Sequence, residues 1–514
     1  MAAVLSGLLS ALSLPAVIVT PWASYPLPDL GWLAWFALVP LYSALARTES
    51  KTAAFRKGFA FGAVHFGMTL YWMVIALHRY GEVSLFVSFL GLAAAVSLMA
   101  VFPAAAAAAA VGLKKRGAPF GLAWILAVSV LEFLRVVFPL GGFPWANLAY
   151  SQRSFIALLQ VLDLTGVAGL LLLILLANAA LAEIRRSKIY AAVFLVLFAA
   201  ALGYGHVRLK TVRADAAARP QVKIGIVQGN IPQEEKWEDE KIDDIIDHHM
   251  KLTERLQTKE PDLLFWPEAA FPAVLPPEIA KIAELRGLTA PLLMGVVRFD
   301  GVMPENWPPK EEDSFRLYNS AVLLKAEGEI EDRYDKVHLV PMGEYVPFQS
   351  VLPFLHAVAE DMSSFTPGAG LHLMQAAGRK FGVTICYEDL FPSISRTFTN
   401  QGAEFLVNLT NDGWYERSSA VFQHFDFSRF RAVENRRGMV RVTNTGVTAV
   451  FSPTGEVVAS LPPFEEGTLT SSVAAGGLAT VYTRWGDWFA WVCVGAAALL
   501  WVWTLTRRGN VQRD

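Results

Sequence analysis

Three reactive side chains stand directly after apolar stretches of the kind that form β-strands. Glu268 follows LLFWP, Lys336 follows a strand pair that ends in RYD, and Cys386 follows FGVTI. Because α/β folds place functional groups where strands end, these residues can meet in one site. The carboxylate would act as a base, the thiol as a nucleophile and the ammonium as a stabiliser of an oxyanion, which is chemistry for attack on a carbonyl group.

Each reactive residue also has a purely structural interpretation. A cysteine at the end of an apolar strand is often buried and inert. A glutamate after Pro267 can begin a helix, and a lysine can lie on the surface. The only other cysteine, Cys493, lies in a separate apolar segment, so we expect no disulfide. His248 and His249 are adjacent, a poor spacing for metal ligands, and we expect neither a metal nor a diffusible cofactor.

The composition indicates a membrane protein with a polar domain. Hydrophobic residues make up 54% of the 514 residues and charged residues only 18%. Residues 1–206 hold 19 charged side chains, whereas residues 207–483 hold 65. This composition excludes a disordered chain, and the net charge of −2 gives no reason to expect a nucleic-acid partner.

A membrane-spanning helix needs about 20 mostly apolar residues. Eight segments meet this description, at 4–20, 29–46, 58–77, 83–110, 118–137, 155–182, 189–206 and 486–506. With eight spans, 13 lysines and arginines fall in the loops and tail of one side, which is typical of the cytoplasmic side. We therefore expect both termini in the cytoplasm and the polar domain outside, at the periplasmic face of a bacterial inner membrane.

The polar domain alternates between short β-type runs and helical or turn segments. A linker is predicted at 213–220 and helices at 233–259, 278–288 and 418–436. Strands are predicted at 222–228, 262–266, 291–297, 319–325, 380–386, 404–410, 438–444 and 447–453. This pattern favours an α/β domain with helices packed on sheets, and the last two strands should form a hairpin.

The stretches around the three reactive residues are recognisable. FWPEAAFP around Glu268, YDKVHLVPMGEYVPF around Lys336 and ICYEDLFP around Cys386 resemble the catalytic blocks of the nitrilase, or carbon–nitrogen hydrolase, superfamily. The resemblance implies a four-layer αββα sandwich with Glu268 as proton acceptor, Lys336 as oxyanion stabiliser and Cys386 as nucleophile. It also implies supporting roles for Glu344, near the lysine, and for Tyr387 and Glu388, which follow the nucleophile.

The predicted spans extend this resemblance over nearly the whole chain. Seven spans before the domain and one after it, together with GGFPWANLAYSQ at 141–152 and VQGNIPQEEKW at 227–237, resemble the apolipoprotein N-acyltransferase family, the membrane-embedded branch of the superfamily. The resemblance implies a membrane domain at 1–212, a periplasmic catalytic domain at 213–475 and a final span with a short tail at 476–514. It further implies a phospholipid as acyl donor and a lipoprotein with a diacylglyceryl cysteine as acceptor.

Aromatic side chains near the catalytic blocks are candidates for lipid contact. Residues 345–358 are apolar but too short and proline-broken to span a membrane, so this segment can dip into the interface and admit acyl chains. An ordinary packed loop is the alternative. The substrate-binding candidates are Trp237, Tyr345, Phe348, Phe354, Trp414 and Tyr415.

The residues alone leave two other functions open. A membrane-tethered amidase or nitrile hydrolase on small molecules would use the same three residues, although it would not need seven preceding spans. A binding or transport protein with an inactive nitrilase-like domain is the other; an inactive domain would be expected to lose a reactive residue, and all three are present.

Overall fold

The computed structural model describes residues 1–19, 24–302, 315–347 and 365–511, and it separates into two compact units. The first unit contains Met1–Lys210, Arg417–Asp426 and Thr480–Asp514, and the second contains Thr211–Glu416 and Phe427–Ala479. The helix α10 (Ile189–Ala218) begins in the first unit and ends in the second.

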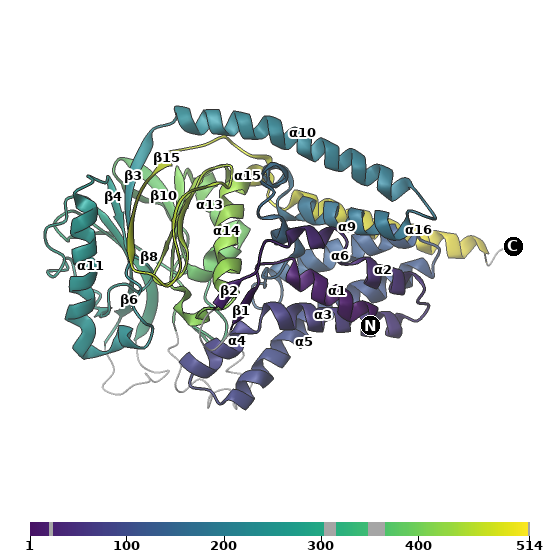
Figure 1. Ribbon diagram of the computed structural model, residues 1–514, viewed down its shortest axis with the longest axis horizontal. Helices are drawn as coiled ribbons and strands as arrows, with labels where there is room; N and C mark the ends of the chain where they lie inside the picture. The colour runs from purple at the N-terminus through teal and green to yellow at the C-terminus, as the bar shows by residue number, and fades with distance from the viewer. Residues whose placement is uncertain (20–23, 303–314, 348–364, 512–514) are drawn as a thin grey trace. The chain divides into compact units, whose positions relative to one another are not determined.

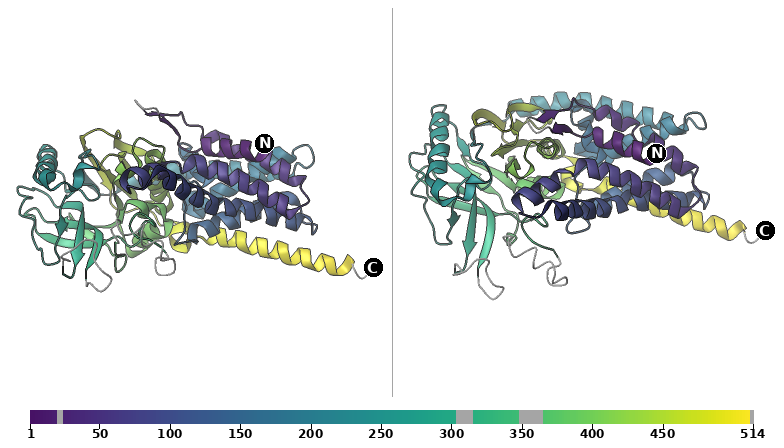
Figure 2. Two further views of the ribbon diagram at one scale, coloured as in Figure 1. Left: turned by 90° about the horizontal axis from the view of Figure 1, so that it is seen from below. Right: turned by 60° about the horizontal axis from the view of Figure 1, so that its bottom comes forward.

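The first unit is built almost entirely of apolar helices. Besides α10 they are α1 (Ala2–Leu12), α2 (Val39–Ala46), α3 (Lys51–Thr69), α4 (Trp72–Ile75), α5 (Leu85–Lys114), α6 (Phe120–Val137), α7 (Ile156–Leu159), α8 (Leu162–Thr165), α9 (Val167–Glu183), α15 (Val481–Trp485) and α16 (Trp488–Val511). The short hairpin of β1 (Val17–Val19) and β2 (Ser24–Pro26) also belongs to it. The helix α16 packs against α6 and α9 and then extends past the other helices of the unit (Figure 2).

Fewer helices than predicted are long and apolar enough to cross a membrane. Within the described residues, four qualify by length and composition: α5, α6, α10 and α16 up to Thr506. The segment Lys51–Thr69 and the following Trp72–Tyr80, bent by 54°, would make a fifth if they form one span. The predicted spans at 4–20, 29–46 and 155–182 coincide with shorter apolar helices, so the number eight is not confirmed.

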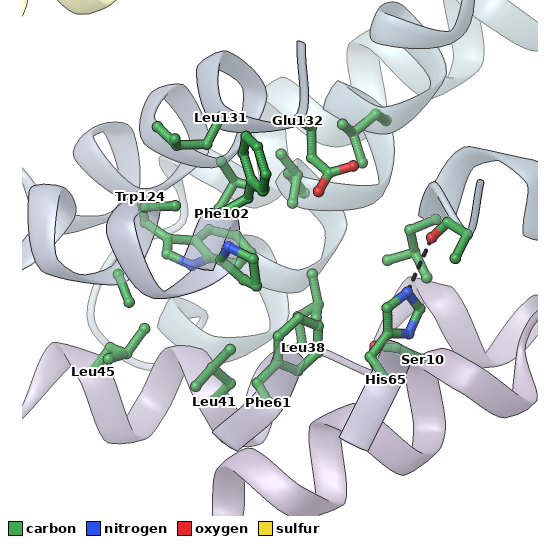
Figure 3. Close-up of a pocket in the computed structure, with 18 of the residues that line it drawn as sticks. Ser10, Leu38, Leu41, Leu45, Phe61, His65, Phe102, Trp124, Leu131 and Glu132 are labelled. Carbon is green, nitrogen blue, oxygen red and sulfur yellow. Dashed lines mark hydrogen bonds between the residues drawn. The ribbon is translucent and has the colours of Figure 1, made fainter. Parts of the chain in front are cut away.

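A cavity of about 60 Å³ lies inside the first unit. Its walls are mostly apolar, and Ser10, His65 and Glu132 line it together with side chains such as Phe61 and Trp124 (Figure 3). His65 Nε2 donates to the carbonyl of Ala146 at 3.0 Å, which orients the ring.

The second unit contains two stacked sheets. In the first, the order is β15 (Gly467–Ala474), β3 (Gln221–Gln228), β4 (Leu263–Phe265), β6 (Leu292–Asp300), β7 (Arg316–Leu324) and β8 (Ile330–Asp335), and β5 (Val274–Leu275) pairs with β6. In the second, it is β14 (Val457–Leu461), β13 (Thr448–Phe451), β12 (Gly438–Thr443), β11 (Phe405–Thr410), β10 (Arg379–Ile385) and β9 (Met374–Ala376). Each sheet has three parallel strands at its centre, β3–β4–β6 and β10–β11–β12, and antiparallel strands at its edges.

Helices cover the outer faces of the two sheets. The helix α11 (Ile242–Gln257) packs on β3 and β15, and α13 (Pro392–Gln401) packs on β10 and β11 (Figure 1). Strands of the two sheets contact each other, β7 with β10 and β3 with β12. With both faces covered, β11 is buried at all six residues, as expected for a central parallel strand. The predicted α/β domain and the β12–β13 hairpin are therefore confirmed.

Two sequence predictions of local structure are wrong. The predicted linker at 213–220 is helical as far as Ala218, because its alanines continue α10. The segment 278–288, predicted to be a helix, consists of turns and irregular chain with a single β-bridge at Lys281. Its apolar residues Ile282 and Leu285 do enter the core, but its backbone pairs with the turn before β8, where Ile282 N donates to Gly328 O.

Candidate active site

The second unit brings Glu268, Lys336 and Cys386 together. Glu268 lies just after β4, Lys336 directly follows β8, and Cys386 directly follows β10, so the two sheets contribute to one site. All three side chains are buried. Lys336 Nζ lies 4.0 Å from Glu268 Oε1, and the charges of both residues act on the thiol of Cys386. The convergence expected from the strand ends is therefore present.

Cys386 is held in an unusual backbone conformation. Its φ is +51°, a left-handed value that non-glycine residues seldom adopt and that is often found at functional positions. The residue begins a 3₁₀ turn at Cys386–Leu390, and Asn408 Nδ2 donates to its carbonyl at 3.1 Å. Asn408 accepts in turn from the buried Arg441 at 3.0 Å. The turn therefore presents the thiol at a fixed position at the end of β10.

The thiol needs a base before it can act as a nucleophile. Burial raises the pKa of the Cys386 thiol well above its ordinary value, and the negative charge of Glu268 raises it further. The positive charge of Lys336 lowers this pKa only in part. Because only the thiolate is strongly nucleophilic, a nearby proton acceptor is required.

Both oxygens of the Glu268 carboxylate are fixed by hydrogen bonds. Asn319 Nδ2 donates to Oε1 at 2.8 Å, and the backbone N–H of Asn411 donates to Oε2 at 2.8 Å. These two bonds fix the orientation of the carboxylate. The arrangement suits a general base.

Lys336 is held by the carboxylate of Glu344 at 2.9 Å. Glu344 Oε1 also accepts from Asn319 Nδ2, and its Oε2 accepts from Val340 N, each at 2.8 Å. Burial alone would lower the pKa of Lys336, but the negative charges of Glu344, Cys386 and Glu268 raise it above its ordinary value. The side chain is therefore a permanent cation beside the thiol, and Glu344 lies next to the lysine as expected.

Glu388 links the segments that carry the lysine and the cysteine. Its carboxylate accepts from the backbone N–H groups of Val337 at 2.7 Å, His338 at 3.0 Å and Ile385 at 2.8 Å. Burial raises its pKa to about 7, although these donors oppose the shift. The ring of the neighbouring Tyr387 packs on His338 and Phe391. These contacts connect the segment that follows β8 with the turn that follows β10.

The predicted lipid-contact residues fall into three groups. Trp237 and Trp414 are 44% and 40% exposed, and Tyr345 is partly buried. Tyr415 is buried. It lies close to the reactive groups, and burial together with the charges of Cys386 and Asp412 raises its pKa. Phe348 and Phe354 lie outside the described residues.

Sequence reasoning missed three residues of the site. Asn319 joins Glu268 to Glu344, Asn411 supplies an N–H to Glu268, and Lys236 Nζ donates to the carbonyl of Glu268 at 2.9 Å. Asn319 lies inside the predicted strand 319–325, so only its polar side chain at a buried strand position could have drawn notice. Lys236 lies in the segment 227–237 that resembles the family, and Asn411 directly follows the predicted strand 404–410, but nothing in their spacing indicates contact with Glu268.

Comparison with known proteins places this geometry in a family. Residues 223–482 match the carbon–nitrogen hydrolase family model, and residues 7–180 match the model of the apolipoprotein N-acyltransferase N-terminal domain. The chain is 36% identical to the apolipoprotein N-acyltransferase of Geobacter metallireducens, over 97% of this chain and 94% of that protein. It is 34% identical to that of Methylococcus capsulatus over 95% of both chains, and 31% identical to that of Rhodopseudomonas palustris over 97% and 94%. The chain therefore belongs to the apolipoprotein N-acyltransferase family.

Proposed function

We propose that this enzyme transfers an acyl chain from a membrane phospholipid to the N-terminal α-amino group of a diacylglyceryl-cysteine apolipoprotein. The observation that carries the proposal is the meeting of a buried thiol, an oriented carboxylate and a fixed ammonium in one site of a chain from this family. The membrane-tethered amidase is not favoured, since the relatives are named as acyltransferases and the N-terminal domain model of that family matches as well.

In the first half-reaction, Glu268 accepts the proton of Cys386 and the thiolate attacks the ester carbonyl of the phospholipid. The ammonium of Lys336 stabilises the negative charge that develops on the carbonyl oxygen. The ester C–O bond then breaks, and Glu268 returns the proton to the leaving oxygen. A lysophospholipid departs, and the acyl chain remains on Cys386 as a thioester.

In the second half-reaction, the α-amino group of the apolipoprotein attacks the thioester. Glu268 accepts a proton from the amine as the new C–N bond forms and the C–S bond breaks. The proton then returns to Cys386, and the N-acylated lipoprotein leaves. The attacking amine must be neutral, so a carboxylate base next to the thioester accelerates this step. Water must be excluded, since it would hydrolyse the thioester.

The charge pattern supports one membrane arrangement. We propose a bacterial inner-membrane enzyme with eight spans, the seven of residues 1–212 and one within 476–514, and with both termini in the cytoplasm. Residues 213–475 would then work on the periplasmic side, where lipid donor and lipoprotein acceptor meet. The 13 basic residues that fall on one side in this topology support the orientation. Four or five helices of the described residues are long and apolar enough to span, which supports a membrane protein but not the number eight.

The experiment is intact-protein mass spectrometry after incubation with phospholipid in detergent and without an acceptor. We expect an added mass equal to one acyl chain, released by hydroxylamine and absent in Cys386→Ser and Glu268→Gln. No adduct on a folded wild-type protein, or an adduct that survives Cys386→Ser, would refute the thioester.

A further inference from the structure

The segment between β3 and α11 is tied to the active site by buried polar side chains. Asn444 exchanges two hydrogen bonds with the backbone of Ile231, accepting from its N–H at 3.0 Å and donating to its carbonyl at 2.8 Å. Gln233 Oε1 accepts from Asn411 Nδ2 at 2.6 Å. Asn411 is the residue whose N–H donates to Glu268. The path of this segment is therefore coupled to the position of the base.

Lys236 is the deepest charged residue of this segment. It lies in the 3₁₀ turn Glu235–Trp237 and is only 2% exposed, whereas its neighbour Trp237 is 44% exposed. Lys236 Nζ donates to the carbonyl of Glu268 at 2.9 Å. Burying a lysine is costly unless a partner of opposite charge lies near, and the carboxylate of Glu268 is such a partner.

The backbone of Glu268 is also held by β6. A Cβ atom on Gly295 would lie 2.5 Å from Glu268 Cα, so only glycine permits this close approach. Gly295 also accepts a hydrogen bond from Ala270 N at 2.9 Å, and Ala269 has a φ of +45°. A tight, strained turn of this kind persists only where several contacts fix it, and the bond from Lys236 is one of them.

We propose that Lys236 is a positioning residue for the base: it fixes the carbonyl of Glu268 and keeps a second positive charge beside the carboxylate. The ionised carboxylate is then aimed at Cys386, while Lys336 remains available to the oxyanion. This role rests on the proposed function and assigns to Lys236 a part in the proton transfer from the thiol.

Several charged and titratable groups surround this pair. They are Lys336, Glu344, Cys386, Asp412 and Tyr415 around Glu268, and His249 behind Lys236. Burial lowers the pKa of Lys236 to about 8, which Glu268 opposes, so at neutral pH the side chain still carries its charge. Among these groups, Lys236 is the cation that acts on Glu268 in two ways, through a hydrogen bond to its backbone carbonyl and through its charge.

The test compares Lys236→Met, which removes donor and charge, with Lys236→Gln, which keeps a donor but removes the charge. Lys251→Met, an exposed position on α11, is the control. The rates of thioester formation on phospholipid and of Cys386 alkylation by iodoacetamide are measured from pH 5 to 10 on folded, full-length protein. We expect both Lys236 variants to shift the acidic limb of each profile upward by about one pH unit, since a cation beside a carboxylate favours its ionised form.

On the acidic limb itself, below its midpoint, this shift corresponds to a roughly tenfold slower reaction. At high pH the Lys236→Gln protein should approach the wild-type rate, whereas Lys236→Met should stay slower because the carbonyl of Glu268 has lost its donor. Unshifted profiles in a folded Lys236→Gln protein, whether the rate is unchanged or uniformly reduced, would overturn the proposal. If wild type formed no thioester, the proposed function would fail, but the alkylation profiles would still decide the role of Lys236.

Discussion

Replacing Asn319 by leucine should impair Glu268 as a base while leaving all three reactive side chains unchanged. Asn319 Nδ2 donates to Glu268 Oε1 and to Glu344 Oε1, each at 2.8 Å. Carboxylates only accept hydrogen bonds, so the amide nitrogen must face them. Leucine has a similar size but no hydrogen-bond donor. The buried carboxylates of Glu268 and Glu344 would therefore each lose one hydrogen bond.

The cost follows from these two bonds. A hydrogen bond to a charged group contributes about 1.5–3 kcal/mol, so losing two costs about 3–6 kcal/mol. The ammonium of Lys336, 2.9 Å from Glu344 and 4.0 Å from Glu268, offsets part of this loss. We therefore expect a loss of about 2–4 kcal/mol in the free energy of unfolding. Glu268 keeps only its bond from Asn411 N, and a misplacement of about 1 Å would slow acylation roughly 100-fold.

The assay measures thermal unfolding and the single-turnover rate of thioester formation on the same detergent-solubilised protein. Lys251→Leu, at an exposed position of α11, is the control and should change neither quantity. A folded Asn319→Leu protein that acylates Cys386 at the wild-type rate would refute the reasoning, because the base would then not depend on its Oε1 partner.

Three further predictions follow from the same geometry. Gly295→Ala should slow thioester formation at least about tenfold, because the added Cβ would lie 2.5 Å from both Glu268 Cα and Ala269 N. An unchanged rate would show that this turn tolerates displacement. Glu388→Gln should lower the free energy of unfolding by about 1.5–3 kcal/mol. In the wild type each carboxylate oxygen accepts from a backbone N–H, whereas the amide NH₂ of glutamine would face one of these donors. Chemical denaturation measures the change, and an unchanged midpoint would contradict it. In Glu268→Gln the rate of Cys386 alkylation should be low at pH 7 and should still increase with pH above pH 9, because burial raises the pKa of the thiol. A rate that reaches its plateau below pH 8 would be incompatible with a buried neutral thiol.

The reactive residues could be predicted because each follows a strand. This pattern can be recognised in local sequence alone. Parallel strands bring their carboxyl ends to one edge of a sheet, so residues that follow such strands can meet. Asn319 and Lys236 could not be found in this way. Asn319 lies within a strand rather than at its end, and Lys236 sits in a charged stretch, where a lysine is usually solvated. Their roles arise from contacts across 51 and 32 residues of chain.

The errors in secondary structure have a similar origin. In 278–288, Ile279, Ile282 and Leu285 are spaced as on a helix, and the latter two are buried as a helix face would be. The backbone, however, bonds to the turn at 328–330, a long-range pairing that periodicity does not reveal. The strand β15 was not predicted, because its sequence GTLTSSVA is rich in polar residues; it forms since β3 offers an edge for eight paired residues.

The most direct test of the account is to chase the acyl-enzyme with an acceptor. The protein is loaded from a phospholipid with a labelled acyl chain, freed of donor, and mixed with a diacylglyceryl-cysteine peptide or with its N-acetylated form. The account predicts that the label leaves Cys386 and appears as an amide on the α-amino group of the first peptide only, at a rate that falls in Asn319→Leu. Release as free fatty acid at the same rate with either peptide would contradict it.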